Sequence, residues 1–92
     1  MKVELTVGPV SGRFTAIEDD HELGIMVYHL TDEEMEIDTT EVSPAFEGKG
    51  VGKFLVSEAV RFAREKHIKI RPMCWFVKLI LNQNPNYSDV LA

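Results

Sequence analysis

Residues 47–53 read Glu-Gly-Lys-Gly-Val-Gly-Lys, a glycine-rich stretch in which a lysine stands on either side of Gly50-Val51-Gly52. Three glycines within five positions cost conformational entropy on folding, so a backbone requirement must select them. The stretch lies between a run of alternating residues and a run of helical periodicity. Main-chain amides at a helix N-terminus carry a partial positive charge and have no intrahelical acceptor. The segment therefore predicts an anion pocket for a phosphate or pyrophosphate, with Lys49 and Lys53 adding charge at its rim.

On the C-terminal side of this turn, the sequence predicts a long amphipathic helix from Gly50 to about Lys66. Its apolar stripe consists of Val51, Phe54, Leu55, Ala59, Phe62 and Ala63. A fifth strand is expected over His67–Arg71, where Pro72 ends it, and a short helix from Cys74 to about Leu81. Asn84 and Pro85 resemble an N-cap and a first helical position, so a last helix is expected to run to Leu91.

On the N-terminal side, the chain alternates in four segments joined by short connections. We expect strands over Lys2–Val7, Arg13–Glu18, Leu23–Leu30 and Met35–Val42. The third is apolar on both faces and is predicted to be central in the sheet. Short connections favour an antiparallel meander. The fold class predicted is α+β: a mainly antiparallel five-stranded sheet, a long helix after strand four and short C-terminal helices.

Ninety-two residues are enough for one domain, so we expect residues 1–92 to share a single core. Hydrophobic residues make up 45% and charged residues 27%, which excludes a wholly disordered chain. No apolar run approaches the ~20 residues that a membrane span needs, and the N-terminus has no apolar signal core. With a single cysteine and no export signal, we expect a cytoplasmic protein without membrane association.

The net charge of −5 is unevenly distributed along the chain. Residues 1–41 contain eleven acidic and two basic side chains, whereas residues 42–92 contain four acidic and eight basic ones. An acidic protein argues against nucleic acid as a partner, because a basic face supplies most of that attraction. The basic half suits an anionic small ligand and the acidic half a cationic substrate, although solubility alone also explains such a balance. No histidine or cysteine pair has metal-ligand spacing, so no metal is expected.

Three phosphate-binding motifs compete for the glycine turn. A P-loop needs glycine and Ser or Thr where Glu47 and Phe54 stand, so that motif fails. The dinucleotide fingerprint needs the first turn of a parallel βαβ unit, whereas here the turn follows a four-stranded meander. The acetyl-coenzyme-A turn, with Gly-x-Gly opening a helix after strand four, is matched by Gly50-Val51-Gly52. A tight glycine turn without any ligand is the alternative.

Three segments together resemble the small GNAT-type N-acetyltransferase-like family: VSPAFEGKGVGKFLVSEAVRFAREKHIKI at 42–70, PMCWF at 72–76 and NPNYSDVL at 84–91. The resemblance covers roughly residues 35–92 and implies a reduced GNAT fold with acetyl-CoA as cofactor. It implies that the pyrophosphate lies on the amides of residues 48–53. It also implies that the pantetheine arm runs beside the strand ending at Val42 toward Cys74, where that strand splays from strand five. The expected cofactor-binding residues are Val42, Gly48, Lys49, Gly50, Val51, Gly52, Lys53 and Lys78.

Two positions depart from the family pattern. Full-size GNAT enzymes usually have Arg or Gln at the position of Glu47, where a carboxylate is expected to point away from a phosphate. Members of the small family often carry a His-Thr pair in the strand before the turn, which here is Thr39-Thr40.

Lys78 either reaches a phosphate of the cofactor or lies on a solvated helix face.

Cys74 is the candidate catalytic residue. A thiol at a helix N-terminus has its thiolate favoured by the helix dipole, and a thiolate can accept an acyl group from a thioester. The alternative is a small buried hydrophobe, which is what most free cysteines are. Trp75 and Phe76 are candidates for a pocket wall or for the core. Tyr87 is a candidate general acid or a packing residue of the last helix.

Three functions are consistent with these patterns. The first is an acetyl-CoA-dependent N-acyltransferase of unknown amine acceptor, small molecule or protein, with backbone donors polarising the thioester and Cys74 near it. The second is a non-catalytic acetyl-CoA-binding or sensing protein, favoured by the missing histidine. The third is a protein-interaction domain without a ligand.

Overall fold

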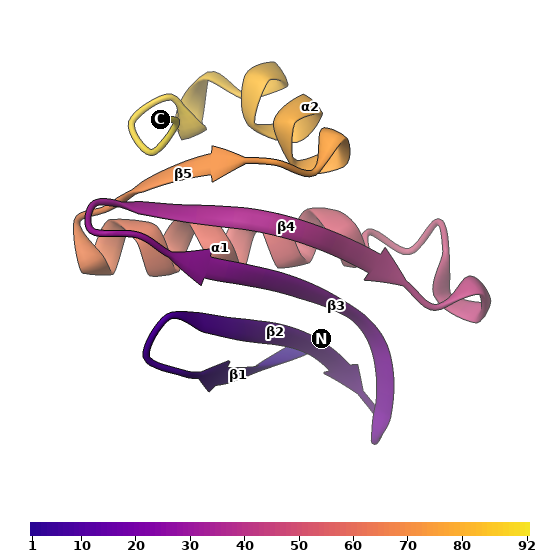
Figure 1. Ribbon diagram of the computed structural model, residues 1–92. Helices are drawn as coiled ribbons and strands as arrows, with labels where there is room; N and C mark the ends of the chain where they lie inside the picture. Colours follow the sequence, from indigo (N-terminus) through magenta and orange to yellow (C-terminus); the bar gives the residue numbers. More distant parts are fainter.

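The computed structural model describes residues 1–92 as a five-stranded sheet with its strands in chain order (Figure 1). The strands are β1 (Lys2–Val7), β2 (Ser11–Glu18), β3 (His21–Leu30), β4 (Glu34–Val42) and β5 (Lys69–Pro72). Helix α1 (Val51–Lys66) joins β4 to β5 and helix α2 (Trp75–Gln83) follows β5. The 3₁₀ turns η1 (Pro44–Phe46) and η2 (Pro85–Tyr87) follow β4 and α2. The predicted α+β class, the meander and the long helix after strand four are confirmed.

The first four strands pair in antiparallel order, and β3 is the central strand of the sheet, as its apolar sequence predicts. Glu18 pairs with His21, so Asp19 and Asp20 alone make the β2–β3 turn. Both have positive φ, 52° and 64°. A two-residue hairpin loop whose twist matches its strands requires this conformation, and aspartate tolerates it better than most residues. Three of the four strands begin one or two residues earlier than predicted.

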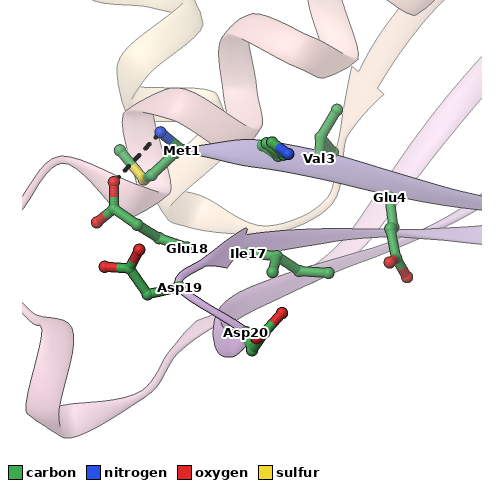
Figure 2. A pocket seen from close by; sticks show the side chains of 8 residues that line it. Met1, Val3, Glu4, Ile17, Glu18, Asp19 and Asp20 are labelled. Carbon is green, nitrogen blue, oxygen red and sulfur yellow. Dashed lines mark hydrogen bonds and ion pairs between the residues drawn. The ribbon is translucent and has the colours of Figure 1, made fainter.

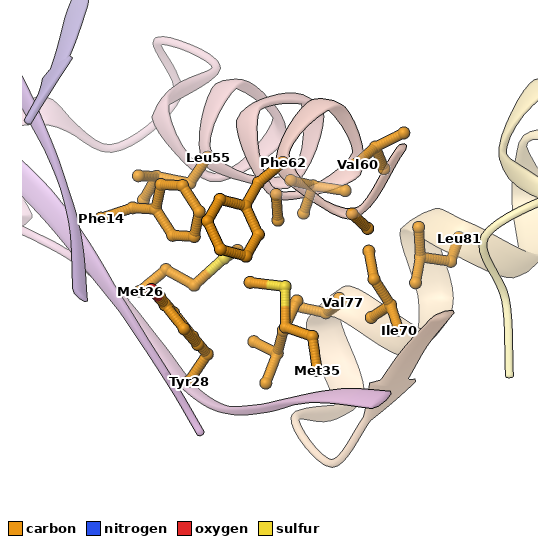
Figure 3. Packing of buried hydrophobic residues seen from close by; sticks show 14 of the residues in the cluster. Phe14, Met26, Tyr28, Met35, Leu55, Val60, Phe62, Ile70, Val77 and Leu81 are labelled. Atoms are coloured by element: carbon orange, nitrogen blue, oxygen red, sulfur yellow. The ribbon is translucent and has the colours of Figure 1, made fainter. Parts of the chain in front are cut away.

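Helix α1 buries one side against the sheet (Figure 3). Its buried residues are Val51, Gly52, Leu55, Val56, Ala59, Val60, Phe62 and Ala63. The predicted stripe is confirmed except at Phe54, which is only partly buried. Val56 and Val60 are buried in addition, because α2 also packs on α1 and widens its covered side. Val77 and Leu81 of α2 join the same core.

Strands β4 and β5 run parallel for only four residue pairs, from Glu34–Lys69 to Ile37–Pro72. The amides of Met73 and Cys74 then both donate to the Ile37 carbonyl, at 3.0 and 3.1 Å. Beyond this point β4 continues to Val42 while the chain after β5 turns into α2. The two strands therefore separate after Ile37.

Two boundaries near β5 differ from the prediction. The strand begins at Lys69 rather than His67, because His67 has a φ of 57° and its amide donates to the last carbonyls of α1. Pro72 is the last residue of the strand rather than the residue after it. A proline is acceptable at this terminal position because the following amides complete the pairing.

The predicted last helix to Leu91 is wrong. Asn84 does cap the turn, since its side chain accepts from the Asn86 amide, but only the 3₁₀ turn η2 follows. The chain then extends beside β5: the Ile70 amide donates to Val90, and the Ala92 amide donates to Ile70. Arg64 fixes this segment by donating to both carboxylate oxygens of Asp89, at 2.9 and 3.0 Å. These long-range contacts outweigh the local helix signals.

Candidate functional site

The glycine turn holds a backbone that only glycine adopts readily. Gly48 and Gly50 both have a φ of 79°, and a Cβ at either position would meet no atom within 4 Å. These two glycines are therefore selected by backbone conformation rather than by close packing. Gly52 has a different cause: a Cβ there would lie 2.7 Å from Cζ of Phe76. Gly52 lets α2 approach the first turn of α1.

The main-chain N–H groups of residues 48–53 have no hydrogen-bond acceptor in the protein, on backbone or side chain. The first amide of α1 that finds one is that of Phe54, which donates to the Gly50 carbonyl at 2.9 Å. Gly50 is the N-cap and supplies no side chain to the orphan donors. The turn and the first helical residues therefore present unpaired donors together with the positive end of the α1 dipole.

A depression of about 340 Å³ lies over this turn. It is lined by Val42, Phe46, Glu47, Gly48, Gly50, Val51, Gly52, Lys53 and Phe76. The structure thus gathers six of the predicted cofactor-binding residues in one place. Phe46 and Glu47 are additional lining residues, and Phe76 lies here with its ring against Gly52. The only sign in the sequence that Phe46 lines the site is that it is an apolar residue directly before the glycine turn.

The other two predicted cofactor-binding residues, Lys49 and Lys78, do not line this depression. Lys49 places its Nζ 5.8 Å from the ring centroid of Phe46, a cation–π distance. Lys78 is exposed on α2. Glu47 belongs to the lining of the depression, so a negative charge lies close to this site. The expectation that its carboxylate points away from a phosphate stays a prediction.

An unpaired strand edge leads away from the depression. Val42 lines the depression, and from Val42 back to Asp38 the side of β4 that faces β5 has no strand partner. This open edge is about 13 Å long, from a rise of ~3.3 Å per residue. It ends where Met73 and Cys74 bond to Ile37. An extended chain with amide groups could pair along it as an additional strand would.

Cys74 stands at the narrow end of this edge. It is the N-cap of α2, is half-buried, and donates its own amide to Ile37. The amides of residues 75–77 in the first turn of α2 have no protein acceptor. Trp75 is 75% exposed, so it does not wall a pocket, whereas Phe76 does. A thiol and a second set of free donors therefore lie together at the end of the edge.

A histidine with two carboxylates lies on the strands beside this end. His29 Nδ1 is 2.7 Å from Asp38 and Nε2 is 3.0 Å from Glu36. The hydrogen bond with Asp38 raises the pKa of His29 above its ordinary value, and Glu36 adds to the rise. Asp38 is an extra residue in β4, since Ile37 pairs with Tyr28 and Thr39 with Val27. His29 is thus a sheet residue with both ring nitrogens engaged.

A larger depression of about 570 Å³ lies at the opposite edge of the sheet, between β1 and the β2–β3 turn (Figure 2). Its lining includes Glu4, Glu18, Asp19 and Asp20. The N-terminal amino group pairs with Glu18 at 3.3 Å and offsets one of these charges. Lys2 is a second cation in the lining, but the four carboxylates outnumber the two cations and would repel a diphosphate. The smaller depression over the glycine turn therefore suits an anion better.

Comparison with known proteins agrees with this geometry. Residues 13–90 match the family of GCN5-related N-acetyl-transferases, and the chain belongs to that family. Protein NATD1 of Xenopus tropicalis is 29% identical over 66 residues, which cover 71% of this chain. The match spans 61% of the length of that relative.

Solved structures show the same fold. The solution structure of a GCN5-like protein from Staphylococcus aureus has a TM-score of 0.70 and 33% identity, covering 97% of this chain and 87% of that one. The structure of AAC(6')-Iy with the bisubstrate analogue CoA-S-monomethyl-acetylneamine has a TM-score of 0.66 at 14% identity, covering 83% and 61%. The predicted GNAT-like fold is therefore confirmed. Neither α1 nor α2 is long and apolar enough to cross a bilayer.

Proposed function

We propose that residues 1–92 act as one GNAT-like domain that transfers an acyl group from acetyl-CoA to an amine. The observation that carries this proposal is the set of unpaired amides at residues 48–53, which opens onto a depression and an unpaired strand edge. Membership of the GCN5-related family supports acetyl-CoA as the acyl donor. The acceptor amine is a small molecule or a protein, and neither nucleic acid nor membrane is part of the proposal.

In this proposal the amides of residues 48–53 bind the pyrophosphate, helped by the α1 dipole and by Lys53. Gly50, Val51 and Gly52 shape the floor of the site, and Val42 begins the edge along which the pantetheine arm lies. Lys49 and Lys78 contribute long-range attraction, because they do not line the depression. The arm then brings the thioester to the narrow end beside Cys74.

At that end the free amides of residues 75–77 are placed to polarise the thioester carbonyl, as donors fixed before the reaction do most effectively. Two routes follow. An amine attacks the carbonyl carbon directly, forming the C–N bond and releasing the coenzyme thiol. Alternatively, the Cys74 thiolate first takes the acyl group and releases the coenzyme thiolate. The amine then attacks the acyl-cysteine, forming the C–N bond and releasing the Cys74 thiol as the amine gives up its proton.

A second candidate function is a non-catalytic protein that binds or senses acetyl-CoA. Thr39 and Thr40 stand where relatives often have a His-Thr pair, and this observation favours it. The same binding residues would then serve without turnover. The two functions share every prediction on coenzyme binding and differ only in thiol release.

The test is release of free thiol from acetyl-CoA by the purified protein with a pool of primary amines. The enzyme proposal predicts amine-dependent release above the buffer rate. With Cys74→Ala, retained release supports direct attack, and loss of release with unchanged coenzyme binding supports the acyl-cysteine route. Release at the buffer rate in both proteins, together with coenzyme binding, would leave only the sensing function.

A further inference from the structure

Strand β1 is an edge strand of the sheet, at the opposite side from β5 (Figure 1). It pairs with β2 on one side, from Lys2–Ile17 to Val7–Gly12, and has no strand partner on the other. A free edge leaves N–H and C=O groups to which another strand can bond, and a proline, a bulge or a very short strand commonly prevents this. β1 has six residues, contains no proline and pairs with β2 without a register shift. Its edge is therefore open to pairing.

The side of β1 that faces α1 carries a row of apolar residues. Val3, Leu5 and Val7 alternate on this side, because Val3 and Leu5 pair with the buried Ala16 and Phe14. Leu5 is 40% exposed and Val7 is 60% exposed. Helix α1 packs mainly on β2 to β5 and leaves this row largely uncovered. An apolar row therefore lies along an unpaired edge.

A groove lies beside this row, on the same side of the sheet. It has a volume of about 180 Å³ and separates the edge strand from α1. Val3 and Leu5 of β1, Phe14 of β2 and Phe62 of α1 supply its apolar lining. The remaining lining residues are charged side chains of α1 that carry both signs. A strand added next to β1 would place its own side chains over this groove.

We propose that the edge of β1 pairs antiparallel with β1 of a second copy of this chain, which joins the two sheets into one. A two-fold axis perpendicular to the sheet keeps both α1 helices on the same face of the joined sheet. Each residue of β1 then lies opposite a residue that points to the same face. The apolar rows of the two copies therefore meet on the α1 side, and each covers what the other exposes.

Charge selects the register of this pairing. Two registers keep both helices on one face and overlap five residues of β1: one places Glu4 opposite itself and the other places Leu5 opposite itself. The first brings two carboxylates together, which is destabilising. The second places Glu4 opposite Thr6, so no like charges face each other. Val7 of one copy then lies opposite Val3 of the other, beside the groove that Val3 lines.

The interface leaves the proposed acetyl-CoA site free. The unpaired half of β4 and the glycine turn lie beyond β2 and β3 from the edge of β1. Dimer formation is thus independent of the proposed function, and either can fail without the other.

The test is the molar mass in solution, measured by sedimentation equilibrium at high micromolar concentration. The unmodified protein is expected at twice the chain mass of 10.4 kDa. Leu5→Lys places two like charges opposite each other and is expected to give the mass of a single chain. Leu79→Lys is the matched control, because Leu79 is 42% exposed but lies on α2, and it should remain a dimer. Circular dichroism checks that both variants are folded.

Disulfide formation under mild oxidation tests the register in a second set of variants, made on Cys74→Ala so that no other thiol reacts. Leu5→Cys places the two thiols directly opposite and is expected to give a covalent dimer. Val7→Cys places them four residues apart along the strands, about 13 Å, and is expected to give none.

Three results would overturn this interface. The first is a single-chain mass for the unmodified protein. The second is a dimer that persists in the folded Leu5→Lys variant. The third is a covalent dimer that forms as readily with Val7→Cys as with Leu5→Cys.

Discussion

At the level of single residues, the three glycines of the turn have different structural roles. Gly48 and Gly50 provide left-handed backbone, and Gly52 provides room for Phe76. A family pattern of alternating glycines does not distinguish these causes, whereas the structure separates them. The distinction matters because the first two shape the donors of the site and the third joins α1 to α2.

We predict that Gly50→Ala destabilises the fold by roughly 1–2 kcal/mol, the cost of left-handed backbone for a residue with a Cβ. For a chain of this size that lowers Tm by about 4–8 °C for each kcal/mol. Gly50→Asn is the matched control and should lose less, because asparagine tolerates this conformation. Thermal unfolding followed by circular dichroism measures both. Equal losses for alanine and asparagine would contradict the backbone explanation.

Glu47 gives a second prediction at this scale. Glu47 belongs to the lining of the depression, and its negative charge there would repel a bound diphosphate. Glu47→Gln is expected to tighten coenzyme A binding by about two- to fivefold at low salt, and less at high salt. Glu65→Gln, at the other end of α1, is the control and should have no effect. Weaker binding by Glu47→Gln, measured by titration calorimetry, would show that the carboxylate assists the site.

Much of the residue-level site could be predicted from the sequence, because its residues are contiguous. The position of the turn before a helix follows from Gly50-Val51-Gly52 and the periodicity after it. Phe76 reaches the site only through the packing of α2 on α1, which is a long-range contact. Whether the predicted cofactor residues and Cys74 act as expected stays a prediction.

At the scale of elements, β4 has two distinct halves. Its first half lies between β3 and β5, whereas its second half pairs only with β3. Asp38, the extra residue of β4, stands at the change and is held by His29 at 2.7 Å. The His29 contacts join β3 to both halves of β4. They therefore stabilise β4 at the point where its pairing with β5 ends.

These contacts predict a dependence of stability on pH. The pKa of His29 is raised in the folded protein by its bond with Asp38, so the protonated form stabilises the fold. That contribution is complete below the unfolded pKa near 6.5 and is lost as the pH rises through the higher folded value. Arg71 lies beyond Glu36 and Arg13 lies on β2 nearby, and neither loses its charge in this range.

The measurement is urea unfolding of the unmodified protein and of His29→Gln between pH 5.5 and about 8.5. The difference in stability between the two should shrink as the pH rises. A constant difference over this range would mean that the His29 bonds do not depend on its charge.

The elements themselves were predicted well where the pattern is local. The meander, α1 and the β5–α2 connection follow from alternation and helical spacing. The predicted last helix is wrong because Asn84 and Pro85 suit the start of a 3₁₀ turn as well as the start of an α-helix. The bridge between Ile70 and Leu91 then decides between them. A sequence does not show which distant strand an end segment will join.

At the scale of the whole molecule, the charge asymmetry follows the fold. The acidic first half forms β1–β4, and the basic second half supplies α1 and the segments after it. The glycine turn, which we propose as the anion site, therefore lies on the basic half, and the most acidic depression lies at the far edge of the sheet. The distribution favours an anionic cofactor at the glycine turn and keeps it from the opposite edge.

The most direct test of the central proposal is an amide NMR titration of the ¹⁵N-labelled protein with coenzyme A. Amides that gain a phosphate acceptor shift strongly, so the resonances of residues 48–53 should show the largest changes, followed by those along Thr39–Val42. Large changes confined to the β1 and β2–β3 edge, with residues 48–53 unmoved, would contradict binding of the coenzyme's diphosphate at the glycine turn.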